Sequence, residues 1–311
     1  MQTGDADDAG ADASDQTTPF HAGEREAQRR AGVHERMAAH GGRFIRPYLP
    51  DQHRDFYARL PCIFAGVRGH AGYPWATVLT GSPGFVCSPS PTQLHLSTAL
   101  HPDDPVVPGL YPGAQLGLLG LEFETRRRNR VNGRLASVGV RQLELHADIS
   151  FGNCPQHIHV RPWPFTGLCQ TSQTRRADRL SASRLGRDPT GLLARADTFF
   201  IATGVDSGGA GAADSGGFDV GHRGGPPGLL EVESERRVAF LDFPGNNFFN
   251  TIGNLSVDPR VGLLVVDFES GGLLHMAGRA MVQWLAQDDG RSQRRVTIDL
   301  EQVVWRPAAL C

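Results

Sequence analysis

The feature that most constrains the fold is that the chain repeats itself once. Residues 117–119 (Gly-Leu-Leu) return as residues 262–264, and residues 81–86 (Gly-Ser-Pro-Gly-Phe-Val) return in altered form as residues 225–230. The offset between the two copies is almost constant, apart from extra length in the Gly-rich stretch 206–217 of the second copy. Repetition at one offset predicts two units of the same architecture in tandem.

Each copy has the same predicted order of elements. A helix ending near Arg59 or Arg195 opens the copy, and Asp188-Pro189 provides a helix start in the second. Short β-rich runs follow, separated by Gly, Pro, Asp and Ser. The predicted strands are residues 62–67, 75–79, 94–97, 115–123, 131–140 and 142–149, then 198–204, 218–222, 238–243, 261–268, 273–284 and 296–304. The fold class is therefore mainly β with a few helices, arranged as two tandem antiparallel split β-barrels.

One helix is predicted in the second copy only. Apolar residues at positions 248, 249, 252 and 255 share one helix face, between the third and fourth predicted strands. The first copy has Pro105, Pro108 and Pro112 in that place, and proline does not fit a helix interior.

The domain organisation follows from these repeats. Residues 1–19 are acidic and predict a disordered tail. Residues 20–165 form the first, degenerate barrel, 166–187 a linker, and 188–311 the second barrel. Residues 206–217 predict a lengthened surface loop.

Composition excludes several classes of function. Basic and acidic side chains balance at 31 against 33, so we expect no nucleic-acid partner. The chain contains no lysine, which excludes Schiff-base and Walker A chemistry and leaves phosphate binding to arginine and backbone amides. No apolar run reaches membrane-spanning length, so no membrane partner is expected. The five cysteines are scattered without a C-x-x-C pair, which favours a reduced, cytoplasmic location and no metal site.

Two segments of the second copy predict an anion site. His222 and Arg223 stand at the end of a strand beside Gly224 and Gly225, where a ligand can approach the backbone. The alternative is a Gly-Pro turn with one solvated arginine. Residues 244–247 (Pro-Gly-Asn-Asn) lead into the predicted helix, whose first amides attract anions, and Asn246 and Asn247 add donors. The alternative is an ordinary helix cap.

Two segments of the first copy also carry polar side chains. The arginine-rich run 126–130 either clamps a phosphate bound by the other copy or forms a solvated turn. His157 and His159 share one face of a predicted extended segment near Cys154. Without a third ligand at fixed geometry, packing and hydrogen bonding are the expected roles of both histidines.

Taken in order, several motifs resemble one family. They are residues 224–228 (Gly-Gly-Pro-Pro-Gly), 244–255 (from Pro-Gly-Asn-Asn to Asn-Leu), 258–264 and 278–280 in the second copy, and 74–76, 81–86, 126–133 and 153–158 in the first. This series resembles the pyridoxamine 5'-phosphate oxidase-like FMN-binding split barrels, over residues 20–305, and is closest to their duplicated, uncharacterised branch.

The resemblance implies FMN as the cofactor, with its phosphate near the helix of the second copy. The cofactor-binding candidates are His222, Arg223, Gly224, Gly225, Asn246, Asn247, Thr251, Asn254 and Arg279. No catalytic residue is assigned, and His222 is the one candidate for such a role.

The implied function is electron or hydride transfer to a small-molecule substrate from an electron donor. The first barrel would complete the FMN groove of the second, as an internal pseudo-dimer, alone or within a homodimer. Two alternatives stay open. One is a non-catalytic barrel that binds flavin for storage or sensing. The other is a haem-binding split barrel with His157 or His159 as axial ligand.

Overall fold

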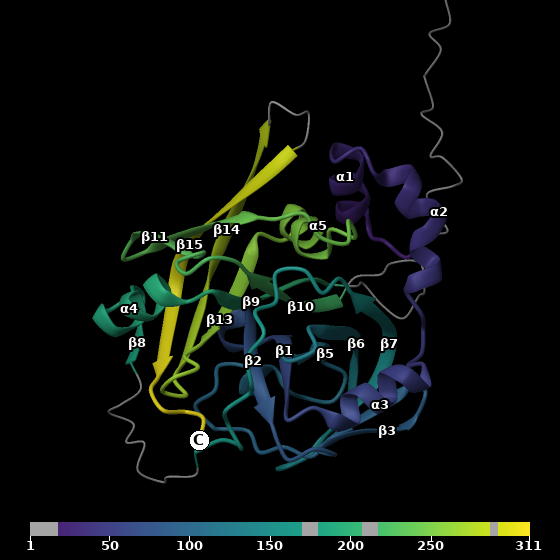
Figure 1. The fold of residues 1–311 in the computed structure, drawn as a ribbon, viewed down its shortest axis with the longest axis horizontal. Coiled ribbons are helices and arrows are strands. Elements are labelled where there is room, and N and C mark those ends of the chain that lie inside the picture. The colour runs from purple at the N-terminus through teal and green to yellow at the C-terminus, as the bar shows by residue number, and fades with distance from the viewer. Residues whose placement is uncertain (1–17, 170–179, 207–216, 287–291) are drawn as a thin grey trace, which may run out of the picture.

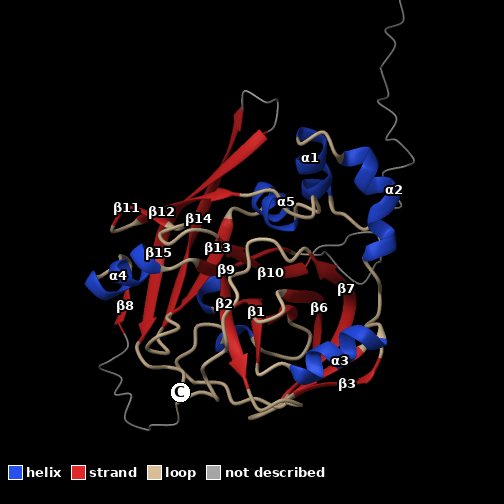
Figure 2. Cartoon of the chain, viewed as in Figure 1, coloured by secondary structure: helices blue, strands red, loops and turns tan. Residues whose placement is uncertain are grey.

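The computed structural model describes residues 18–169, 180–206, 217–286 and 292–311. Two antiparallel sheets make up most of this part of the chain (Figures 1 and 2). The first half contains β1 (Cys62–Arg68), β2 (Pro74–Thr80), β3 (Val86–Ser90), β4 (Gln93–Leu96), β5 (Gln115–Glu122), β6 (Arg127–Val138) and β7 (Leu143–Asn153). The second half contains β8 (Leu180–Ala182), β9 (Thr198–Val205), β10 (Gly217–Gly224), β11 (Glu231–Ser234), β12 (Arg237–Asp242), β13 (Arg260–Val266), β14 (Leu273–Ala286) and β15 (Ser292–Arg306).

The two sheets have the same strand order. The first runs β2-β1-β5-β6-β7-β4-β3 and the second β10-β9-β13-β14-β15-β12-β11, with β8 added beside β15. Every strand predicted from the sequence is present. The fold class is therefore confirmed as mainly β, with two sheets consistent with tandem split barrels. The sequence missed β3, β8 and β11, which are short and, in the case of β11, exposed along its whole length.

Five α-helices accompany the sheets within the described residues: α1 (Ala22–Arg30), α2 (His34–Phe44), α3 (Asp51–Arg59), α4 (Arg187–Arg195) and α5 (Asn250–Val257). The predicted ends of α3 and α4 are confirmed, but α4 is capped by Gly186 and begins before Asp188. The first copy has only a short 3-10 turn, η3 (Val107–Gly109), near its prolines, and a second such turn, η2 (His70–Gly72), follows β1. Helices α1 and α2 were not predicted.

Helix α5 begins later than the sequence predicts. Asn247 and Phe249 have positive φ angles of 64° and 62°, a left-handed conformation that a right-handed helix cannot contain. Asn246 and Asn247 therefore lie in the loop before α5 and are not its first residues. The prediction that residues 244–247 lead straight into the helix is therefore wrong, and so is the alternative that they form an ordinary helix cap.

The halves share one hydrophobic core. Phe64 of β1 stacks on Phe200 of β9 with ring centroids 3.5 Å apart, inside a buried apolar cluster drawn from both sheets. The backbone of the other half passes close to the repeated glycines Gly117 and Gly262. A Cβ atom on Gly117 would lie 2.3 Å from the Phe218 carbonyl oxygen, and one on Gly262 would lie 2.2 Å from that of Pro74. Only glycine allows this approach.

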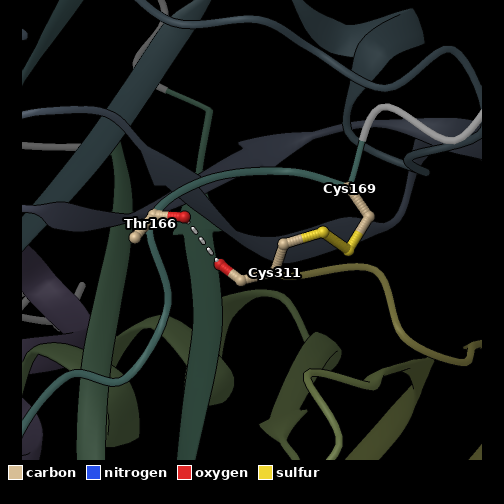
Figure 3. The surroundings of a disulfide bond; sticks show 3 residues. All are labelled: Thr166, Cys169 and Cys311. Carbon is tan, nitrogen blue, oxygen red and sulfur yellow. Dashed lines mark hydrogen bonds between the residues drawn. A yellow bond between two sulfur atoms is a disulfide. The ribbon is translucent and has the colours of Figure 1, made fainter.

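The predicted linker is partly ordered against the C-terminus. Cys169 and Cys311 form a disulfide across 142 residues of sequence, and Thr166 donates its hydroxyl hydrogen to the Cys311 carbonyl oxygen (Figure 3). The sequence favours reduced, unpaired cysteines. It does not predict this pair, because the two cysteines lie far apart in the sequence and no local spacing indicates that they meet. Residues 170–179 of the linker and 207–216 of the predicted loop lie outside the described residues. The domain boundaries therefore stay predictions.

Candidate functional site

A groove opens between the two halves, with about 830 Å³ of space including its mouth. Residues from both sheets and from the loop before α5 line it. They are Leu119, Arg128, Arg130, Asn153, Gln156, His157, His222, Arg223, Gly224, Asp242, Phe243, Pro244, Gly245, Asn246, Asn247, Phe249, Thr251, Ile252 and Arg294.

Side chains on one face of strand β6 place two arginines of the first half in the groove. Successive side chains of a strand point to opposite faces, so Arg128 and Arg130 share one face. Arg127 points elsewhere, where it donates to the Gln52 carbonyl oxygen and lies over the Phe56 ring. The arginine-rich run is therefore neither wholly a solvated turn nor wholly a clamp, because alternate residues of it reach the groove.

The arginines of the second half are paired with a carboxylate. Asp242, at the end of β12, accepts from Arg223 Nε at 3.1 Å and from Arg294 Nε at 2.9 Å. Asp242 is only 6% exposed, so this pairing is shielded from solvent. Two positive charges thus share one negative charge on this wall.

Of the two arginines that the first half contributes, Arg130 is paired with a carboxylate and Arg128 is not. Arg130 Nη1 lies 3.0 Å from Asp219 Oδ1, and Asn132 donates to the same oxygen at 2.6 Å. Arg128 makes no ion pair with any carboxylate in the described part of the chain, and its Nε donates to the Cys154 carbonyl oxygen at 2.6 Å. Burial, together with Arg223 and Arg130 nearby, lowers the pKa of Arg128 to about 10. The groove therefore has excess positive charge next to Arg128.

Gly221 in β10 leaves room for two of these guanidinium groups. A Cβ atom on Gly221 would lie 3.2 Å from Arg223 Nη1 and 3.4 Å from Arg130 Nη2. Arginines from opposite halves thus converge on one backbone position. We call Arg128, Arg130 and Arg223 the arginine cluster.

His222 is buried beside this cluster. Its Nδ1 lies 3.3 Å from Arg128 Nη1, and because arginine only donates, Nδ1 is the acceptor and the ring hydrogen is on Nε2. Burial, followed by Arg128 and Arg223, holds the pKa of His222 well below its usual value of 6.5. His222 is thus a neutral donor, and its Nε2 has no hydrogen-bond partner.

Three buried donors of the lining residues lack partners. Besides His222 Nε2, they are Asn153 Nδ2 and Arg130 Nε. Asn153 Oδ1 accepts from Asn246 Nδ2 at 3.5 Å, which leaves its own amide hydrogens for another acceptor. Buried donors normally have partners, so three together indicate an acceptor-rich ligand.

The structure brings most of the sequence-predicted residues together. His222, Arg223, Gly224, Asn246, Asn247 and Thr251 all line the groove. Three others do not. Gly225 lies beside the groove, where its carbonyl oxygen accepts from His159 Nε2 at 2.8 Å. Asn254 is buried behind the groove, and Arg279 lies on β14 opposite Arg260, in another part of the sheet.

The sequence missed Asp242, Arg294 and Asn153 as site residues. Asn153 and Arg294 lie far from the Gly-rich segment along the chain, and Asp242 lies on another strand, so spacing gives no sign of these contacts. Asp242 and Arg294 lie on the neighbouring strands β12 and β15. They could have been predicted only by knowing that these strands pair and which side chains share a face.

The two histidines of the first copy do not lie in a strand. His157 has a φ of 63° and stacks on Phe243 with ring centroids 5.2 Å apart, so the expectation that His157 and His159 share one strand face is wrong. Within the described ranges, no set of three His, Cys, Asp or Glu side chains is arranged to hold a metal ion.

Two of the groove positions have apolar counterparts in the other half, whereas the counterpart of Arg130 is the buried His275. By strand register, Val78 occupies the place of His222, and Leu273 occupies the place of Arg128. Both belong to the apolar cluster shared by the sheets. The two halves therefore share a topology, whereas the polar lining described above occurs at only one of these two positions.

No family model matches the chain, and no curated protein matches it. Three solved structures are similar to it. HupZ from Group A Streptococcus is 15% identical, with a TM-score of 0.29, over 39% of this chain and 98% of HupZ. A Clostridium acetobutylicum protein of the pyridoxinephosphate oxidase family, related to general stress protein 26, is 8% identical, with a TM-score of 0.30, over 40% of this chain and 89% of its own. A FAD-binding protein from Mesorhizobium loti is 16% identical, with a TM-score of 0.26, over 42% of this chain and 98% of its own.

The Clostridium acetobutylicum protein is described as a member of the pyridoxinephosphate oxidase family. Because the identities and TM-scores are low, we base the function on the groove itself.

Proposed function

We propose that the groove binds FMN and that the protein is an FMN-dependent oxidoreductase acting on a small substrate. The observation that carries the proposal is the arginine cluster together with three unpartnered buried donors. Donors without acceptors suit an anion, and a phosphate offers several acceptor oxygens and up to two negative charges. Arginine is the one long cationic side chain in this sequence, so it has to supply the charge.

The shape and chemistry of the lining fit the rest of the molecule. Leu119, Phe249 and Ile252 give apolar surface for a planar ring. Asn246 and Asn247 give amide groups at the mouth, and His222 gives a neutral N–H donor on the floor. When bound, FMN supplies one- or two-electron transfer, and the protein supplies binding, orientation and exclusion of water. We assign no proton-transfer residue.

The first test is the cofactor content of the purified protein. Denaturation should release FMN, which chromatography of the supernatant detects. If the protein is purified without FMN, the fluorescence of added FMN should be quenched on binding. Gly221→Val should weaken this binding about tenfold or more, because the new side chain displaces the guanidinium groups of Arg223 and Arg130 without removing a charge. Gly152→Ala in β7 is the matched control, since its nearest contact would be Asn129 Oδ1 at 3.6 Å.

The outcomes separate the alternatives. If the protein neither releases nor binds FMN, the cofactor proposal is wrong. If FMN binds but a wide panel of nicotinamide and deazaflavin donors fails to reduce it, the enzyme proposal is wrong and a storage or sensing role replaces it. A Soret absorption band in place of a flavin spectrum would indicate the haem alternative.

A further inference from the structure

Helix α1 packs on α5 in the second half. Figure 1 shows α1 beside α5, and the contact is close enough to need glycine on both sides. A Cβ atom on Gly23 would lie 2.4 Å from the Gly253 carbonyl oxygen, and one on Gly253 would lie 2.6 Å from Glu24 Cα. The backbones of the two helices therefore touch directly.

A chain of polar contacts runs from α1 to the arginine cluster. Asn250, the first residue of α5, donates its amide hydrogen to Glu24 Oε1, and its own Oδ1 accepts from Arg130 Nη1 at 3.1 Å. Glu24 Oε2 accepts from the His21 backbone N–H at 2.9 Å, which fixes the carboxyl group at the start of α1. Glu24 is 3% exposed and Arg130 is 5% exposed, so water does not replace these contacts.

A second chain reaches the same arginine. His21 Nδ1 accepts from the Gly23 backbone N–H, so its Nε2 carries the hydrogen and donates to Asn254 Oδ1 at 2.8 Å. Asn254 Nδ2 in turn donates to Asp219 Oδ2 at 3.1 Å. The other oxygen of Asp219 accepts from Arg130.

Helix α1 also supports the loop that lines the groove. Gln28 Nε2 donates to the Phe248 carbonyl oxygen at 3.2 Å, and the Phe20 ring packs against the Phe248 ring at 5.5 Å between centroids. At the end of the helix, Arg30 lies over the Trp284 ring, whose surroundings include Arg294 of the groove. Three separate contacts thus join α1 to groove-lining segments.

We propose that α1 is a component of the anion site, in which Glu24 positions Arg130 through Asn250. Ligand binding and the docking of α1 on α5 then stabilise each other, because both depend on the same contacts. This inference rests on the proposed function for the identity of the ligand, but the coupling itself needs only an anion in the groove.

The charge of Glu24 gives the inference a distinctive signature. Glu24 is faced by His21 on α1, Asp219 on β10 and Arg130 on β6. Burial, followed by the charge of Asp219, raises the pKa of Glu24 from 4.5 to about 8. Below that pH the carboxyl group is neutral, and Asp219 is the carboxylate that pairs with Arg130. As pH rises through about 8, a new negative charge appears beside Arg130, and anion affinity should fall.

The test compares substitutions at Glu24 in the full chain. We expect Glu24→Ala to weaken FMN binding at pH 7 roughly five- to tenfold, the effect of losing about one hydrogen bond to a charged group. Glu24→Gln keeps the side-chain size and one of the two acceptor oxygens, so it should restore part of the affinity at pH 7 and remove the wild-type loss of affinity between pH 7 and 9. Glu26, 67% exposed on the same helix, gives the matched controls Glu26→Ala and Glu26→Gln.

Amide hydrogen exchange provides a second measurement that does not depend on these variants. FMN and, separately, inorganic phosphate should each slow exchange in residues 22–30. Gly23→Val blocks the contact with Gly253 without changing any polar group, and it should weaken the binding of both FMN and phosphate.

Each result decides something. If wild type binds phosphate but not FMN, the proposed cofactor is wrong, and phosphate then measures the coupling. If either probe binds while exchange in α1 and the pH dependence of Glu24→Gln match those of wild type, the inference is overturned. If neither probe binds, the anion site and the inference both fail.

Discussion

At the scale of single residues, the groove differs from an ordinary surface because its charges are unevenly paired. Arg223 and Arg294 share Asp242, and Arg130 has Asp219, whereas the partners of Arg128 among the described residues are the Cys154 carbonyl oxygen and the His222 ring. Buried positive charge without a counter-ion costs free energy, which an anionic ligand would offset. An anionic ligand would therefore interact most favourably with the charge of Arg128.

We expect Arg128→Ala to weaken FMN binding tenfold or more, since a hydrogen bond to a charged group contributes about 1.5–3 kcal/mol. Arg223→Ala should have a smaller effect, because Arg223 is already engaged with Asp242 and leaves that carboxylate paired with Arg294. Fluorescence titration with FMN measures both. Arg127→Ala is the control, because this neighbouring arginine points away from the groove. An unchanged affinity in Arg128→Ala would place the phosphate elsewhere.

At the scale of elements, a disulfide ties the segment before α4 to the C-terminus. Cys169 and Cys311 are 142 positions apart in the sequence, and the loop they close includes the described strands and helices of the second half. Closing so long a loop restricts the unfolded chain far more than the folded one. The bond should therefore stabilise the second half against unfolding.

Thiol counting tests this element directly. The unfolded, unreduced protein should expose three reactive thiols, those of Cys62, Cys87 and Cys154, and the reduced protein five. Cys311→Ser should lower the free energy of unfolding by about 2–4 kcal/mol, measured by urea denaturation without reductant. The same substitution under reducing conditions is the control, where it should have little effect. Five thiols without reductant would rule out the bond.

The strands could be predicted from the sequence, but several other elements could not. Runs such as β9 and β13 are nearly continuous apolar segments between turn residues, so their pattern identifies them. The β11 strand is exposed throughout and carries no apolar signal. The α1 sequence is mostly polar, and its buried positions include Gly23, Glu24 and Gln28, which sequence patterns assign to the surface.

Only part of the site could be predicted, because sequence patterns are local and most of the contacts in the site join distant strands. Glycines and polar residues at the end of β10 indicate a ligand when taken alone. The partners of His222 and Arg223 come from β6, β12 and β15, so only the tertiary fold brings them together. Asn254 lies in the same motif as several lining residues but faces other surroundings, and Arg279 lies in a motif that contributes no lining residue.

At the scale of the whole molecule, the two halves have one topology and unequal chemistry. The first half contributes Arg128 and Arg130 to the groove, and the second half contributes the loop before α5. In the other half, the counterparts of His222 and Arg128 are the apolar Val78 and Leu273. A tandem chain can keep one site and pack the other position with apolar side chains, because each half can change independently.

This arrangement predicts that neither half is stable alone. Separate chains of residues 18–169 and 180–311 would expose the apolar cluster that contains Phe64 and Phe200, and the second would also lack α1 on α5. We expect each to aggregate or to unfold without a cooperative transition, whereas the two expressed together should copurify. Circular dichroism during heating and size-exclusion chromatography measure both properties. The full chain cleaved between residues 170 and 179 is the control, since it keeps both halves in place. Two soluble halves that unfold cooperatively and do not associate would contradict the shared core as the source of stability.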